Sequence, residues 1–173
     1  MTRYIVLLRG INVSGKNRLP MQDLRDILQQ QGYQNIQTYI QSGNIILDTK
    51  EDKTKIIQKI KDSIYQKFEY NVPVIVVSIE ELKTVIDYYP FPIENPKIVA
   101  FVFLNQKAAV ENFEIKGIKK DKFLIKDKMV YIYCPTGFAK TKLSNNLFER
   151  KLDVIATTRN YNTTKKLFNL TTN

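Results

Sequence analysis

The order of apolar patterns in the first half of the chain restricts the fold more than any other feature. Tyr4–Leu8 is a continuous apolar run, which is typical of a strand buried on both faces. Pro20 then opens a predicted helix, because its missing N–H costs nothing at a helix start. The apolar stripe of this helix is Met21, Leu24, Ile27 and Leu28, and Gly32 predicts its left-handed end.

A hairpin and a second helix follow. Ile36, Thr38 and Ile40 alternate with glutamine and tyrosine, as in an edge strand, and Ser42-Gly43 predicts a tight turn into a strand over Asn44–Asp48. The next helix has one apolar face, and Pro73–Ser78 is again a continuous apolar strand. The apolar face consists of Ile56, Ile57, Ile60, Ile64 and Phe68.

The first half therefore predicts β-α-β-β-α-β, the ferredoxin-like plait. In that topology the first and third strands are central and the second is an edge strand, which agrees with its amphipathic pattern. Ser78 and Glu81 form a capping box that predicts a further short helix.

The second half resembles a degenerate copy of the same plan. Residues 89–96 contain Pro90, Pro92 and Pro96 and are typical of a linker. We therefore expect an α+β protein with a ferredoxin-like subdomain over 1–88 and a basic α+β subdomain over 89–173, packed on it as one compact unit. The expected elements are a strand over 97–104, a helix over 105–113, a hairpin over 122–134, a helix near 143–152, a short strand over 154–157 and a terminal helix capped by Asn160 or Asn162.

Several strands of both halves are apolar at every position, so both faces of each sheet must be covered. The two halves are expected to pack through their open sheet faces or through one continuous sheet.

Two absences in the composition narrow the chemistry. The chain has no histidine, which excludes Ser-His and Cys-His nucleophilic catalysis and any metal site that uses histidine. Its single cysteine, Cys134, lies in an apolar run and predicts a buried core thiol. Without disulfide potential, a secretory signal or a transmembrane run, we expect a cytoplasmic protein with no membrane and no metal.

The net charge of +10 is unevenly distributed. Residues 1–88 carry 12 Lys and Arg against 10 Asp and Glu, whereas residues 89–173 carry 15 against 7. A basic half suggests an anionic partner, either nucleic acid or a phosphorylated molecule. Scattered lysines that only aid solubility are the alternative.

The stretch Arg9–Arg18 is the first candidate site. Two glycines bracket it, it follows a central strand, and it precedes a helix N-terminus, where amides and the helix dipole favour an anion. Gly10–Asn17 nearly matches a P-loop. We reject that interpretation because the helix begins later, at Pro20, and because Asn17 lacks the hydroxyl that binds magnesium.

Three further polar clusters stand at strand ends or helix starts: Gln41–Asn44, Phe138–Asn145 and Thr157–Asn160. A hairpin turn, a solvated basic turn and a helix cap are the respective alternatives. Arg159 offers a bidentate fork for phosphate or carboxylate. The predicted ligand-binding residues are Arg9, Gly10, Asn12, Gly15, Lys16, Asn17, Arg18, Asn44, Lys142, Arg159 and Asn160.

These clusters together resemble the bacterial family catalogued as domain of unknown function 1697. The resemblance rests on Arg9–Val13, Thr38–Asn44, Lys142–Asn145 with Glu149–Leu152, and Thr157–Asn160, in order along the chain. It implies two plait-like subdomains and supplies no activity, substrate or catalytic residue. Ser14 stands where the family usually has glycine, and Tyr161 where it often has tryptophan.

Three functions remain open on the sequence. The first is binding of an anionic, phosphate-bearing small molecule or nucleotide in a cleft between the two halves, with the Gly10–Arg18 loop facing Arg159. The second is electrostatic binding of nucleic acid, with an affinity that falls steeply with salt. The third is a histidine-independent enzyme acting on a phosphorylated substrate. The catalytic residues, the cofactor and the oligomeric state are unknown at this stage.

Overall fold

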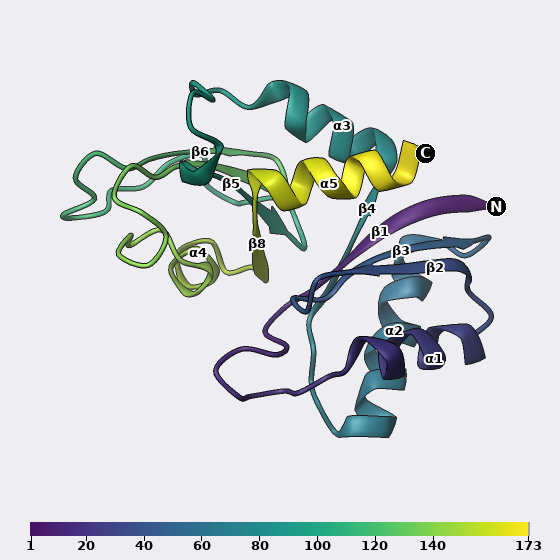
Figure 1. The fold of residues 1–173 in the computed structure, drawn as a ribbon. Coiled ribbons are helices and arrows are strands. Elements are labelled where there is room, and N and C mark those ends of the chain that lie inside the picture. The colour runs from purple at the N-terminus through teal and green to yellow at the C-terminus, as the bar shows by residue number, and fades with distance from the viewer. Residues whose placement is uncertain (173) are drawn as a thin grey trace. The chain divides into compact units, whose positions relative to one another are not determined.

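The strands of the chain form two separate four-stranded antiparallel sheets (Figure 1). A computed structural model describes residues 1–172, which divide into two compact units. The first unit comprises Met1–Lys83 together with the end of the chain from Leu167, and the second comprises Thr84–Lys166. The presence of two sheets means that the expected alternative of one continuous sheet is wrong.

The first unit is a ferredoxin-like plait, as predicted. Its sheet has the order β2-β3-β1-β4, so β1 and β3 are central and β2 is an edge strand. The elements in chain order are β1 (Thr2–Leu8), α1 (Met21–Gln30), β2 (Gln34–Tyr39), β3 (Asn44–Thr49), α2 (Lys53–Phe68) and β4 (Val74–Ser78).

Both helices of this plait lie on the same face of the sheet (Figure 1). The predicted stripe of α1 is buried there, and α2 begins where Asp52 accepts a hydrogen bond from the Lys55 N–H at 2.9 Å. Val6 and Leu8 of β1 belong to this core. Ile5 and Leu7, which point to the other face, are also buried, and this accounts for the unbroken apolar run.

The predicted capping box closes the start of α3 (Ile79–Tyr88). The Ser78 N–H donates to the Glu81 carboxylate at 2.8 Å, and the Glu81 N–H donates to the Ser78 hydroxyl at 3.1 Å. Both bonds satisfy amides that have no partner inside the helix.

The second unit repeats the strand order of the first. Its sheet is β6-β7-β5-β8, in which β5 takes the central place that β1 has in the first sheet. The degenerate second plait is therefore confirmed. The elements are a 3₁₀ turn η1 (Pro96–Ile98), β5 (Val99–Leu104), β6 (Lys122–Lys126), β7 (Met129–Tyr133), α4 (Asn145–Leu152), β8 (Ala156–Asn160) and α5 (Tyr161–Thr172). Helix α5 begins in the second unit, and its residues from Leu167 belong to the first.

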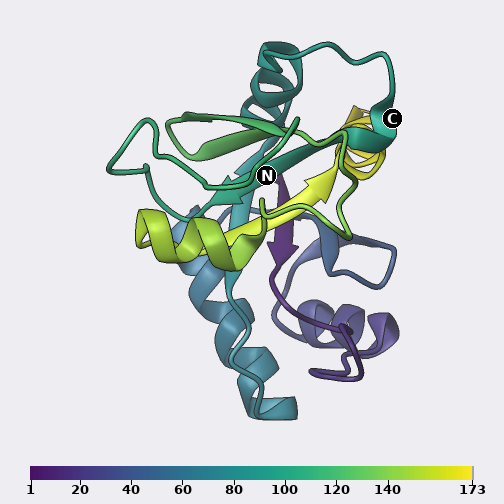
Figure 2. The ribbon, with the colours of Figure 1, turned by 90° about the vertical axis from the view of Figure 1, so that its left-hand side faces the viewer.

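An irregular segment, 105–121, replaces the first helix of this plait, and the expected helix over 105–113 is wrong. Asn105 does not cap a helix, because its side-chain oxygen accepts from the Ile155 N–H at 2.8 Å. The segment still fills the core, since Phe113 packs against Phe123 and Phe148 with ring centroids 5.1 and 6.2 Å away. Figure 2 shows this part of the chain as long teal-green loops without a helix.

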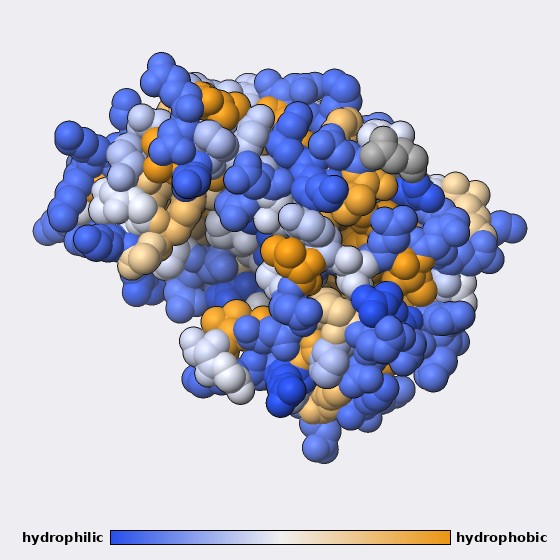
Figure 3. Space-filling view, viewed as in Figure 1, coloured by the Kyte–Doolittle hydropathy of each residue, from blue (hydrophilic) through white to orange (hydrophobic). Residues whose placement is uncertain are grey.

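Hydrophilic side chains cover most of the face shown in Figure 3, and apolar residues appear there in small separate patches. Within residues 1–172, no helix has the length and apolar character needed to cross a bilayer.

Candidate functional site

The loop that follows β1 is an ordered hairpin. The Lys16 N–H donates to the Val13 carbonyl at 2.9 Å, and the two residues form an isolated β-bridge. Ser14 and Gly15 form the tip with φ of +50° and +74°. A φ in this region favours glycine, which stands at only one of these two positions.

Two asparagines of the loop hydrogen-bond to its backbone, and one of them also joins the loop to the turn before β3. The side chain of Asn12 accepts from the Leu19 N–H at 2.8 Å and donates to the carbonyls of Leu19 and Gln41 at 2.9 and 2.8 Å. Asn17 donates to the Gly10 carbonyl at 3.0 Å. These two side chains therefore fix the shape of the loop.

The three cationic side chains of the loop differ in their exposure to solvent. Arg9 is half-buried, and its backbone N–H donates to the Pro73 carbonyl at 3.0 Å. Lys16 and Arg18 are exposed. The predicted role of these residues in binding a ligand stays a prediction.

The turn before β3 is tightly packed. Asn44 is fully buried and donates to the Tyr39 carbonyl and the Ser42 hydroxyl, both at 2.9 Å. A Cβ added to Gly43 would lie 2.6 Å from the Cβ of Leu8, so only glycine fits there. The last two residues of the Thr38–Asn44 motif, Gly43 and Asn44, therefore have a structural reason.

Arg159 and Asn160 belong to the second unit. Arg159 lies in β8 opposite Phe101, and its guanidinium donates to the Thr157 hydroxyl at 2.7 Å and to the Thr158 carbonyl at 3.0 Å. Burial lowers the pKa of Arg159 to about 10. Asn160 accepts from the Thr163 N–H at 2.8 Å and is therefore the cap of α5, one of the two caps predicted.

A groove of about 610 Å³ lies in the second unit, between the start of α4 and the irregular segment. Four cationic side chains line it together with one carboxylate. The lining residues are Glu114, Ile115, Lys116, Lys142, Ser144, Asn146, Leu147, Arg150 and Lys151. Lys142 is the one predicted site residue among them.

One wall of the groove fixes the ammonium of Lys142. Its Nζ atom donates to the backbone carbonyl of Lys116 at 2.7 Å. Gly117 leaves the necessary space, because a Cβ there would lie 2.7 Å from that Nζ. The ammonium is held at the wall by an exposed hydrogen bond and by the shape of residues 116–117.

The other wall is one face of α4. Ser144 caps the helix by accepting from the Leu147 N–H at 3.2 Å. Asn146 and Arg150 are four residues apart, as are Leu147 and Lys151, so all four lie on the same side of the helix. The four-residue spacing of these positions is visible in the sequence. Lys116 lies in a segment without regular structure, and no sequence pattern indicates that it lines the groove.

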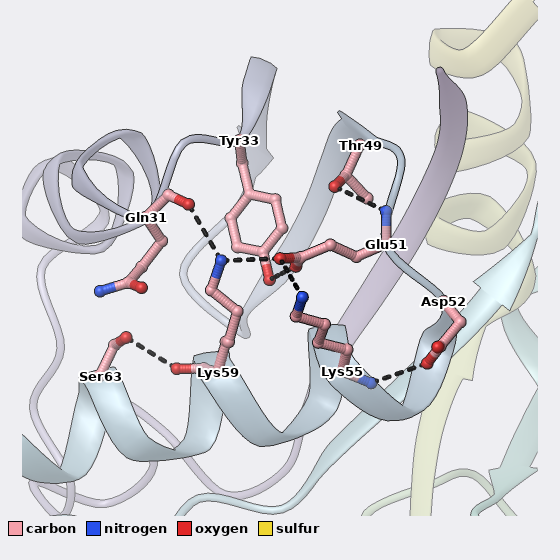
Figure 4. A network of polar contacts seen from close by, with 8 residues as sticks. All are labelled: Gln31, Tyr33, Thr49, Glu51, Asp52, Lys55, Lys59 and Ser63. Atoms are coloured by element: carbon pink, nitrogen blue, oxygen red, sulfur yellow. Dashed lines mark hydrogen bonds and ion pairs between the residues drawn. The ribbon is translucent and has the colours of Figure 1, made fainter.

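A polar network in the first unit joins the end of α1 to the start of α2. Figure 4 shows that Tyr33, Lys55 and Lys59 all point toward Glu51. The Tyr33 hydroxyl donates to Glu51 at 3.1 Å, and Lys59 Nζ donates to Glu51 at 2.9 Å and to the Gln31 carbonyl at 3.1 Å. Burial of the ring and the adjacent carboxylate raise the pKa of Tyr33, which disfavours the phenolate needed for base chemistry. The network stabilises the plait.

A buried carboxylate organises the chain after β7. Asp121 accepts from the Thr136 N–H at 3.0 Å and from the Thr141 hydroxyl at 2.7 Å. Burial alone would raise the pKa of Asp121, but these hydrogen bonds lower it below its usual value. The neighbouring Cys134 is fully buried, as predicted, and burial raises the pKa of its thiol.

The second sheet has an aromatic face that the sequence analysis missed. Phe101 and Tyr131, on the two central strands, are buried under Tyr89, whose ring lies 5.6 and 6.3 Å from theirs. The Tyr89 hydroxyl donates to the Ile132 carbonyl at 2.7 Å and holds the ring in place. Plaits that bind single-stranded RNA stack bases on exposed rings at such positions, and here the chain's own tyrosine covers them.

Among residues 1–172, no group of three or more Cys, Asp or Glu side chains is arranged to hold a metal ion. The predicted site residues are divided between the units: Arg9–Arg18 and Asn44 lie in the first, and Lys142, Arg159 and Asn160 lie in the second.

The sheets and the groove define an α+β protein of two plait-like units, with a cationic groove on the second. A family model described as a protein of unknown function (DUF1697) matches residues 1–131, and the chain belongs to this family. Among solved structures, the chain is similar to the conserved bacterial protein SP0830 from Streptococcus pneumoniae. The two share 22% identity and a TM-score of 0.71 over 97% of each chain, which supports the fold. No curated protein matches the chain.

Proposed function

We propose that this protein binds an anionic, phosphate-bearing small molecule or nucleotide. The observation that carries the proposal is the groove beside α4, which is lined by four cationic side chains and only one carboxylate and has a volume suited to a small ligand. The predicted Lys142 lines this groove together with Lys116, Arg150 and Lys151.

The cations of the groove are available to a ligand. Within the described part of the chain, residues 1–172, none of the four forms an ion pair with an acidic side chain. An exposed ion pair contributes little by itself, so affinity requires several cations that act on one anion. A groove that places four of them around one space provides that arrangement.

The helix α4 adds to the attraction at its N-terminal end, near Lys142, where its amides carry a partial positive charge. The carbonyl end of a helix repels anions, but Arg150 and Lys151 occupy the last turn of α4 and offset this effect. The groove is therefore favourable to an anion at both ends of the helix.

The alternatives have weaker support. Electrostatic binding of nucleic acid relies on the same charges, yet the aromatic face of the second sheet is occupied by Tyr89. A histidine-independent enzyme needs a group poised for acid–base work, and the Tyr33–Glu51–Lys59 network favours the neutral phenol. A cytoplasmic location is part of the proposal, and the single buried thiol is consistent with it.

Isothermal titration with inorganic pyrophosphate at fixed ionic strength tests the proposal. We expect saturable binding, and we expect Lys142→Ala to weaken it about tenfold through loss of one charge-assisted contact. The control is the pair Lys165→Gln and Lys166→Gln, which removes two adjacent helical cations outside the groove. Absence of binding, or an equal loss of affinity in the control, would refute the proposal.

A further inference from the structure

We infer that the groove beside α4 takes a chain of linked phosphates, such as inorganic triphosphate or the triphosphate of a nucleotide, and recognises the phosphate chain alone. This inference rests on the proposed function and narrows its ligand. Its basis is the distribution of charge along α4, the composition of the lining and the fixed position of Lys142.

The cations of the groove are spread along the helix. Lys142 stands two residues before the cap Ser144, whereas Arg150 and Lys151 stand in the last turn. With a rise of 1.5 Å per residue, the backbone positions of Ser144 and Lys151 are about 10 Å apart. A single phosphate contacts donors at about 3 Å and reaches one end only, whereas linked phosphates reach both.

Between these two ends the helix side of the groove carries no negative charge. The N-terminal amides of α4 attract an anion at one end, and the guanidinium of Arg150 and the ammonium of Lys151 do so at the other. The intermediate lining consists of Asn146 and Leu147, neither of which repels a phosphate. Successive phosphates of one chain can therefore lie along the groove without meeting a like charge from the helix.

The lining offers no place for a nucleobase. It contains no aromatic ring, and its apolar members are Ile115 and Leu147. Stacking of a base on an aromatic side chain contributes about 1–3 kcal/mol, and this contribution is absent here. A nucleotide is thus expected to bind through its phosphates, with the base outside the groove.

Two features of the irregular segment sharpen the selectivity. The ammonium of Lys142 donates to the carbonyl of Lys116 at 2.7 Å, so this cation is already positioned in the groove before a ligand binds. Glu114 is the one acidic lining residue. Its carboxylate repels a bare phosphate chain, so Glu114→Gln should increase the affinity for the metal-free anion.

Titrations at neutral pH, without divalent cations and at matched ionic strength, compare orthophosphate, tripolyphosphate and ATP. We expect tripolyphosphate to bind at least about tenfold more tightly than orthophosphate, and ATP to bind within about threefold of tripolyphosphate. The double variant Arg150→Gln, Lys151→Gln should lose about tenfold for tripolyphosphate and little for orthophosphate. Lys165→Gln, Lys166→Gln is the matched control and should retain all three affinities.

The outcomes separate the two claims. Equal affinities for orthophosphate and tripolyphosphate, both lost in Lys142→Ala, would overturn the inference and leave the proposed function standing. ATP binding far more tightly than tripolyphosphate would overturn the exclusion of the base. Failure of every phosphate to bind would remove the inference together with the proposed function.

Discussion

Lys142 and Lys116 are joined by a hydrogen bond from the ammonium of the first to the backbone carbonyl of the second, at 2.7 Å. The contact depends on the residue that follows Lys116, since Gly117 has φ of +72° and its missing Cβ leaves the space that the ammonium fills. A glycine far from any motif therefore places a charge in the groove.

Gly117→Ala should weaken pyrophosphate binding about threefold to tenfold, because the new methyl group displaces the ammonium of Lys142. The positive φ adds a cost of about 1 kcal/mol to folding. Gly137→Ala is a matched control in the same unit, because Gly137 has φ of +91° and no atom within 4 Å of an added Cβ. An affinity unchanged in Gly117→Ala would show that the position of Lys142 does not matter for binding.

Gly43→Ala should destabilise the first unit by about 2–4 kcal/mol, because it combines a strained φ of +82° with a contact to the buried side chain of Leu8. Gly15→Ala has a similar φ of +74° and open space around it, so it should cost only about 1 kcal/mol. Urea denaturation of the two variants measures the difference. Equal losses would mean that the packing around Gly43 relaxes without cost.

The two lysines of the Glu51 network should differ in importance. Lys59 lies 2.9 Å from the Glu51 carboxylate with 30% of its side chain exposed, whereas Lys55 lies 3.7 Å away with 63% exposed. Lys59→Gln should lower the free energy of unfolding by about 1–2 kcal/mol. Lys55→Gln should change it by less than about 0.5 kcal/mol. A larger effect from Lys55 would contradict the arrangement in Figure 4.

Asp121 should make the stability of the protein sensitive to acid. Its pKa is lower in the folded chain than in the unfolded chain, so its contribution is present above the ordinary carboxyl range and is lost as the pH falls through the lowered pKa. Asp121→Asn should therefore flatten the dependence of stability on pH below about pH 4. Urea midpoints across this range measure it.

Asp127→Asn is the control for this prediction, because the Asp127 side chain is 68% exposed. A profile that changes equally in both variants would remove the special role of Asp121.

Ile40 has a left-handed backbone conformation, which asparagine and glycine adopt more easily than isoleucine. It is β-branched, has φ of +52°, and is 49% exposed. Ile40→Asn should raise the free energy of unfolding by about 0.5–1 kcal/mol, because asparagine tolerates this φ. Ile93→Asn, at another exposed isoleucine, should have almost no effect. A loss of stability in Ile40→Asn would show that the side chain makes contacts worth more than the strain.

The first plait could be predicted because local and global signals agree there. The unbroken run Tyr4–Leu8, the helical stripe from Met21 and the capping box at Ser78 each act through neighbours in the sequence, and each was confirmed. In the segment 105–121 the same reasoning predicted a helix that does not form. Asn105 has the residue type of a helix cap, but a backbone amide fifty positions away uses its oxygen, and no local rule anticipates such a partner.

Only part of the groove could be predicted from the sequence, because some of its residues are brought there by partners far away in the chain. Lys142 belongs to a polar cluster at a helix start, and Arg150 and Lys151 follow with helical spacing. Lys116 and Gly117 contribute through the path of an irregular segment, which depends on how Phe113 packs against Phe123 and Phe148. The asparagines Asn12 and Asn17 were predicted to bind a ligand, but their side chains hydrogen-bond to backbone groups of their own loop and, from Asn12, to the carbonyl of Gln41.

The first compact unit includes the residues from Leu167 onward, although Thr84–Lys166 forms the second unit. On the ribosome, the plait strands of the first unit emerge early, but the piece that completes the unit is made only after the whole second unit. The second unit is thus an insertion in the first, and a nascent chain stalled before Leu167 would carry an unfinished N-terminal unit. Because Leu167 and Thr171 are buried, the last contacts of the first unit form only after this distant segment has been synthesised.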